Sequence, residues 1–135
     1  MRTLVVALWI AGLVQLAIVV GNFVIPKKLK YGENLAHVAP IIRQIFLVHS
    51  GYIVGIVLFF AAVSFGFPKE LAIGRGLGRF LAASMAVFWI CRIPLQLFYY
   101  DATLRRANRA SDVAMILALV FLSLTYAAAA VLQRP

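Results

Sequence analysis

The sequence predicts an all-α integral membrane protein, an antiparallel four-helix bundle in which residues 1–135 form a single domain. Hydrophobic residues make up 64% of the chain and charged residues only 13%, too few to cover a soluble domain of this size. The apolar residues gather in four runs of about 20 residues, the length that an α-helix needs to cross a bilayer. Short polar segments separate these runs, so successive helices should lie antiparallel.

The four predicted spans cover residues 3–25, 43–67, 79–100 and 112–132. Pro26 and the basic segment "KKLK" that follows it are expected to end the first span, because proline cannot donate to the helical hydrogen-bond ladder. Pro40 precedes the second span and suits the first turn of a helix. Pro68, in "GFPKE", is expected to end this second helix.

The third span contains "FWICRIPLQLFYYD" at residues 88–101, which places Arg92 among aromatic and aliphatic residues. Pro94 removes one backbone donor and frees the carbonyl group of Ile90, so we expect a kink beside Arg92. A freed carbonyl can accept a hydrogen bond from an arginine or bind a polar group of a ligand.

Two further segments mark helix beginnings. "GRGLG" at residues 74–78 lacks the lysine and the serine or threonine of a phosphate-binding loop. It is expected to be a flexible lead into the third helix. Ser111 and Asp112 offer an N-cap and an acidic first-turn residue for the fourth helix.

Thirteen lysines and arginines against four acidic residues give a net charge of +9. Most charges lie between apolar runs, which indicates a bilayer with anionic headgroups as partner rather than nucleic acid. The first and third connections carry more basic residues than the opposite side, which predicts that these two connections are cytoplasmic. Their side holds Lys27, Lys28, Lys30, Arg43, Arg105, Arg106 and Arg109. The opposite side holds Arg2, Lys69, Arg75, Arg79 and Arg134.

Folding the chain at the second connection aligns polar residues of two helices in depth. If residue 71 is the centre of this connection, His49 lies 22 positions before it and Arg92 lies 21 positions after it. The same alignment brings Arg43 close to Asp101. We therefore expect an Arg43–Asp101 ion pair, worth roughly 0–1 kcal/mol at an exposed membrane boundary.

Helical phase groups the same residues further. At about 100° per residue, Arg92, Gln96 and Tyr99 share one face of the third helix, and His49 and Tyr52 share a face of the second. These five residues are the candidate ligand-binding cluster. A cation inside a membrane needs an acceptor, which an anionic ligand or a partner subunit would supply. The structural alternative is that Arg92 reaches toward the headgroups and His49 is a neutral residue of the bundle interior.

Other chemistry is sparsely represented. Gly51 and Gly55, in "GYIVG", form the small-xxx-small spacing that is typical of helix packing in membranes. We expect no metal site, because histidine, cysteine and carboxylate ligands are too few. No motif in the sequence identifies a cofactor. No complete group of catalytic residues can be recognised. His37 and His49 belong to one connection–helix segment, so they cannot clamp a single haem across two helices.

"RQIFLVHSGYIV" at residues 43–54, followed by "FWICRIPLQLFYYD", resembles a group of short bacterial four-helix integral membrane proteins without an assigned activity. The resemblance covers about half of the chain, mainly the second and third spans. It implies a location in the bacterial inner membrane and no particular mechanism.

"CRIPLQLFYYDATLRR" at residues 91–106, together with chain size and basic balance, is similar to the membrane-associated eicosanoid and glutathione metabolism family. Members of that family are typically trimers that bind glutathione with arginines and tyrosines at subunit boundaries. The corresponding region here comprises Arg92, Gln96, Tyr99, Tyr100 and Arg105. The segment "GENLAHVAP" before the second helix departs from the Asn/Glu segment that the family has there. This segment therefore supports neither glutathione binding nor trimerisation.

Two functional hypotheses follow. The first is a non-enzymatic accessory subunit or a lipid- or amphiphile-binding module, within a homo-oligomer or a larger membrane complex. The alternative is a membrane-embedded glutathione-dependent transferase or isomerase that acts on a lipophilic substrate. Native mass spectrometry after gentle extraction separates them, because large partners favour the first and a closed homotrimer favours the second.

Overall fold

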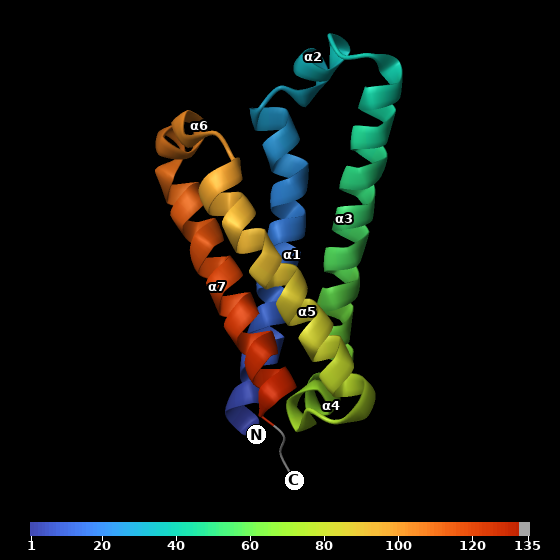
Figure 1. Cartoon of the computed structure of the whole chain (residues 1–135), viewed down its shortest axis with the longest axis vertical. Coiled ribbons are helices and arrows are strands. Elements are labelled where there is room, and N and C mark those ends of the chain that lie inside the picture. Colours follow the sequence, from blue (N-terminus) through green and yellow to red (C-terminus); the bar gives the residue numbers. More distant parts are fainter. Residues whose placement is uncertain (133–135) are drawn as a thin grey trace.

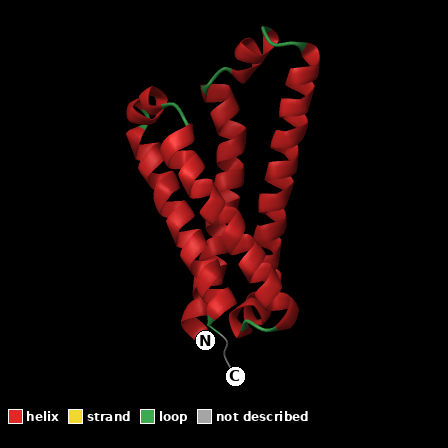
Figure 2. Ribbon diagram, viewed as in Figure 1, coloured by secondary structure: helices red, strands yellow, loops and turns green. Residues whose placement is uncertain are grey.

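The structure, a computed structural model, describes residues 1–132, so Arg134 lies outside the described part of the chain. Every regular element of this part is a helix (Figure 2). Four helices are long and apolar enough to cross a membrane, which confirms the predicted fold class. They are α1 (Arg2–Lys28), α3 (Pro40–Gly66), α5 (Gly76–Pro94) with its continuation η1 (Leu95–Tyr99), and α7 (Arg109–Val131).

Each connection between the long helices contains a short helix. These are α2 (Tyr31–Ala36), α4 (Pro68–Ile73) and α6 (Ala102–Ala107). Figure 1 shows α2 and α6 at one end of the molecule and α4 at the other. The long helices therefore alternate in direction, and the first and third connections share a side as the sequence predicts.

The long helices pack as two antiparallel pairs, α1 with α3 and α5 with α7. Helix α1 also contacts α7, and α4 contacts α1, α5 and α7. The pairs come together at the α4 end and separate toward α2 and α6, so the bundle is V-shaped (Figure 1). We call the end with α4 the closed end and the end with α2 and α6 the open end.

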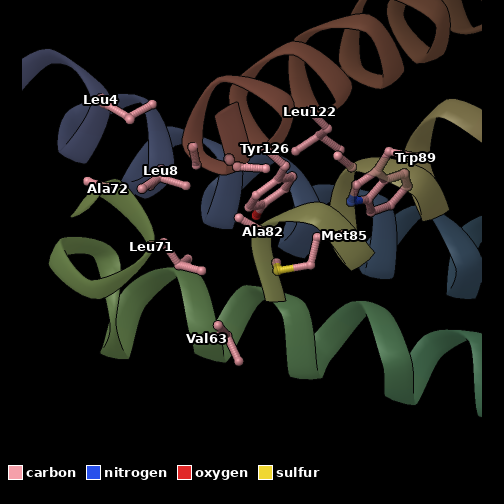
Figure 3. Close-up of a cluster of buried hydrophobic side chains, with 14 of the residues drawn as sticks. Leu4, Leu8, Val63, Leu71, Ala72, Ala82, Met85, Trp89, Leu122 and Tyr126 are labelled. Carbon is pink, nitrogen blue, oxygen red and sulfur yellow. The ribbon is translucent and has the colours of Figure 1, made fainter. Parts of the chain in front are cut away.

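The core lies in the closed half of the bundle. Leu8, Leu71 and Leu122 are fully buried there, from α1, α4 and α7 (Figure 3). All the buried residues of α3 lie between Val57 and Ser64. Inside a bilayer the lipid tails are as apolar as the side chains, so the hydrophobic effect does not drive helices together. Close side-chain packing of this kind drives their association instead. The closed half therefore holds the two helix pairs together.

Two helix ends differ from the predictions. Pro26 does not end α1, which continues to Lys28 with Leu29 N–H donating to the carbonyl of Ile25 at 2.9 Å. Pro26 has no N–H to donate to the carbonyl four residues earlier, so the helix loses one hydrogen bond. Its φ angle is helical, so the helix can continue through it. The N-cap of α7 is Asn108 rather than Ser111, because α6 ends only one residue earlier.

The hydrogen-bond register of the helix changes beside Arg92, where the sequence predicted a kink. Pro94 is the last residue of α5, and the following turn, η1, is a π-helix. Tyr100 N–H donates to the carbonyl of Leu95 at 3.3 Å, five residues back. The wider turn re-aims the side chains and carbonyls that follow Pro94.

"GRGLG" is a close-packed corner and not the flexible lead that we expected. Gly74 and Gly76 have positive φ angles of 66° and 50°, a region that favours glycine. A Cβ atom on Gly74 would lie 2.7 Å from the carbonyl oxygen of Ala129. A Cβ atom on Gly78 would collide with the carbonyl oxygen of Glu70. The absence of side chains lets α4 lie directly against α5 and α7.

We predict that Gly78→Ala destabilises the protein, because the added methyl group meets backbone that cannot rotate away. The expected loss is about 1–3 kcal/mol in the free energy of unfolding, seen as a lower melting temperature in detergent by circular dichroism. The control is Gly21→Ala in α1, where nothing lies within 4 Å of the added atom. Equal losses in the two variants would show that α4 does not pack tightly against α5.

Candidate functional site

Arg92 turns toward the open end of the bundle. Its Nη1 donates a hydrogen bond to the hydroxyl of Tyr100, and its Cζ lies 5.1 Å from the centroid of the same ring. The Tyr100 ring packs edge-on against Tyr99, with centroids 6.3 Å apart. The guanidinium thus has a hydrogen-bond acceptor and an aromatic face within its own chain.

Gln96 binds the acid at the start of α7. Its Nε2 donates to Asp112 Oδ1 at 2.7 Å, and Arg105 donates to both Asp112 oxygens at 3.0 and 3.1 Å. Arg105 also donates to the carbonyl oxygen of Leu97, within η1, at 2.6 Å. This Gln96–Arg105–Asp112 cluster ties η1, α6 and α7 together. A hydrogen bond from an arginine to the freed carbonyl of Ile90 stays a prediction.

His49 and Tyr52 lie on the exposed part of α3. The Nδ1 of His49 is 2.9 Å from the carbonyl oxygen of Ile45, one turn earlier in the same helix. Among the described residues, no hydrogen bond joins His49 to Arg92 or Gln96. The V shape separates this part of α3 from α5 (Figure 1). A common site that includes all of them stays a prediction.

The expected ion pair between Arg43 and Asp101 also stays a prediction. Arg43 is an exposed residue near the start of α3. Asp101 precedes α6, and its Oδ1 accepts a hydrogen bond from the backbone N–H of Thr103 at 2.7 Å. This bond satisfies one of the donors at the beginning of α6. At the same end the structure does place the pair Arg105–Asp112, whose side chains are 23% and 12% exposed.

Sequence reasoning missed a polar junction in the closed half. Gln15 Nε2 donates to the Tyr126 hydroxyl at 2.9 Å, and Ser64 Oγ lies 2.5 Å from the same hydroxyl. All three residues are fully buried. Figure 3 shows Tyr126 among the apolar side chains of the core. The hint that the sequence offered was a polar residue, Gln15, within the first apolar run. Nothing in the sequence indicated that it contacts residues of α3 and α7.

The side chains that gather at the open end are mainly arginines and aromatic residues. Among the described residues, no three histidine, cysteine or acidic side chains gather to hold a metal ion. Guanidinium groups at the open end can donate planar pairs of hydrogen bonds to phosphate or carboxylate. Asp112 neutralises Arg105, so the arrangement suits binding of an anion by the other arginines nearby.

We predict that Tyr126→Phe lowers stability, because it leaves Gln15 and Ser64 without their shared partner in the core. The expected loss in unfolding free energy is about 1–3 kcal/mol, measured as thermal unfolding in detergent. Tyr99→Phe is the matched control, since the Tyr99 side chain is 80% exposed and its ring contact survives. Equal stability of Tyr126→Phe and wild type would mean that the junction contributes nothing.

Comparisons with known proteins do not assign the chain to a group. No family model, no curated protein and no solved structure matches it. The resemblance of residues 43–54 and 88–101 to short bacterial membrane proteins therefore stays a prediction, and so does the similarity of residues 91–106 to the eicosanoid and glutathione family. The chain is a small four-helix membrane protein of all-α fold.

Proposed function

We propose that this small membrane protein is a non-enzymatic subunit of a membrane assembly, which binds a transmembrane helix of another protein with the outward face of α3. The observation that carries the proposal is the exposed Tyr52 side chain, which lines a groove with two open glycines near the middle of α3. Three properties of this face support it: low coverage by the rest of the chain, two uncovered glycines and polar groups without partners.

The first half of α3 is hardly covered by its own chain. None of its residues from Pro40 to Ile56 is buried. Helix α1, its packing partner, covers α3 mainly toward the closed end. Lipid tails can cover an exposed helix face when all the side chains on that face are apolar. This face is not wholly apolar, so lipid tails are a poor neighbour for it.

Gly51 and Gly55 open onto the surface of α3. A Cβ atom on either glycine would meet nothing within 4 Å. With their neighbours they form a shallow groove of about 440 Å³, lined by Val48, Gly51, Tyr52, Gly55, Ile56 and Phe59. Glycines at this spacing let two helix backbones approach closely in a membrane. The groove therefore suits a second helix with small residues at its contact.

Two polar groups flank this groove. Tyr52 lies close to the middle of the 27-residue helix, and its side chain is 72% exposed. Its hydroxyl has no hydrogen-bond partner in the described part of the chain. The His49 ring uses Nδ1 on its own helix, and among the described residues its Nε2 has no hydrogen-bond partner. Hydrocarbon offers neither donor nor acceptor, so a helix that carries an amide or hydroxyl satisfies these groups better than lipid.

We predict that Gly51→Leu and Gly55→Leu release the partner, because leucine fills the groove and keeps the backbones apart. Native mass spectrometry of protein extracted gently from its own membrane measures the assembly. The expected weakening is about tenfold or more for each variant, because overpacking a close contact costs about 1–3 kcal/mol. Gly21→Leu in α1 is the matched control, because that glycine also faces open space.

The outcomes separate the hypotheses. A stoichiometric second protein, lost in the α3 variants and kept in Gly21→Leu, supports the proposal. A wild-type protein that remains a monomer in native membranes contradicts it. A closed homotrimer that binds glutathione, and loses it in Arg92→Leu, supports the alternative enzyme instead. The contact of Arg92 with Tyr100 is the observation that favours this alternative.

A further inference from the structure

A concave basic site lies at the open end, where α6 meets the first turn of α7. It has a volume of about 620 Å³ and is lined by Ala102, Arg105, Arg106, Arg109, Asp112 and Val113. We propose that this site binds the phosphate of an anionic phospholipid headgroup. The proposal concerns α6 and α7 and does not depend on what covers α3.

The charges of the site are only partly balanced. Arg105 and Asp112 neutralise each other through two hydrogen bonds, at 3.0 and 3.1 Å. Arg106 and Arg109 line the same concavity, and the described residues give neither of them an acceptor or an ion-pair partner. Two guanidinium groups therefore remain for an anion. Phosphate fits them well, since it can accept paired hydrogen bonds from each planar fork.

The beginning of α7 adds donors on the same wall. Its N-cap, Asn108, makes no side-chain capping bond. Instead, Asn108 Oδ1 accepts a hydrogen bond from Lys28 Nζ at 2.7 Å, which brings a further cation to this end. The first-turn N–H groups of a helix have no intrahelical acceptor and carry the positive end of its dipole. An anion next to Arg109 is stabilised by both effects.

The depth of the site favours a lipid over a dissolved anion. Helix α7 has 23 residues and is about 34 Å long at 1.5 Å per residue. Its first turn then lies at headgroup level when the helix crosses the roughly 30 Å hydrocarbon layer. Val113 lines the site, and Leu117, one turn deeper, is 64% exposed. An acyl chain attached to the bound phosphate can lie along these two residues.

The test uses the full-length protein in nanodiscs of phosphatidylcholine mixed with phosphatidylglycerol. Native mass spectrometry counts the phosphatidylglycerol that stays bound. We expect enrichment of this lipid by the wild type, and about a tenfold loss of affinity for each of Arg106→Gln and Arg109→Gln, as is typical when a charged hydrogen bond is removed. The double variant Arg106→Gln with Arg109→Gln should lose more affinity than either single variant. Arg75→Gln with Arg79→Gln is its control, since it removes the same two charges at the closed end.

The controls make each outcome decisive. Arg106→Lys with Arg109→Lys keeps the charge but loses the planar fork, so partial retention is expected. Lipid binding that is kept when Arg75 and Arg79 are both replaced by Gln, and lost when Arg106 and Arg109 are both replaced by Gln, supports the site. If both pairs of replacements reduced phosphatidylglycerol binding equally, the lipid would be held by unspecific charge attraction. That result would overturn the proposal. A rise in melting temperature with soluble glycerol 3-phosphate, without preference among the lipids, would reassign the site to a free phosphate ester and overturn the lipid assignment.

Discussion

The hydroxyl group of Tyr126 joins three helices at a single buried point, and the arrangement of the bundle depends on it. It contacts Gln15 of α1 and Ser64 of α3 from its place on α7. A polar group that enters hydrocarbon without a partner is unfavourable, so the Gln15 amide nitrogen and the Tyr126 hydroxyl favour a bundle in which α1 and α7 meet at this level. Ser64 joins them from α3, while its hydroxyl also donates to the carbonyl of Phe60 in its own helix at 2.8 Å. The junction thereby fixes the register of α1, α3 and α7. Helix α5 follows through its packing on α7.

The fold class could be predicted because bilayer thickness sets the length of a span, and four apolar runs reach that length. The helix ends and corners could not, because they depend on local geometry and on distant neighbours. Pro26 was expected to end a helix and costs it only one hydrogen bond. Gly78 was expected to lend flexibility, whereas its missing side chain makes room for the carbonyl of Glu70. Gln15 was visible, but its partner Tyr126 lies 111 residues away.

The candidate site was predicted only in part for a geometric reason. Counting residues from the centre of a connection gives the depth of a residue along the bundle. Residues at equal depth touch only where the axes of their helices stay close together. In this bundle α3 and α5 diverge toward the open end (Figure 1), so His49 and Arg92 can share a level without touching. Gln96 does reach the neighbouring helix α7, where it donates to Asp112. Its partner Asp112 was expected only as an acidic first-turn residue of the fourth helix and not as part of a polar cluster.

The taper of the bundle also makes its shape sensitive to the membrane around it. Helix α3 has 27 residues and α7 has 23, which correspond to lengths of about 40 and 34 Å. Both exceed a hydrocarbon layer of about 30 Å, and helices that are too long accommodate by tilting. Because the two arms are joined at the closed end, they tilt in opposite directions. We therefore expect a thinner bilayer to spread α2 and α6 apart and a thicker one to draw them together.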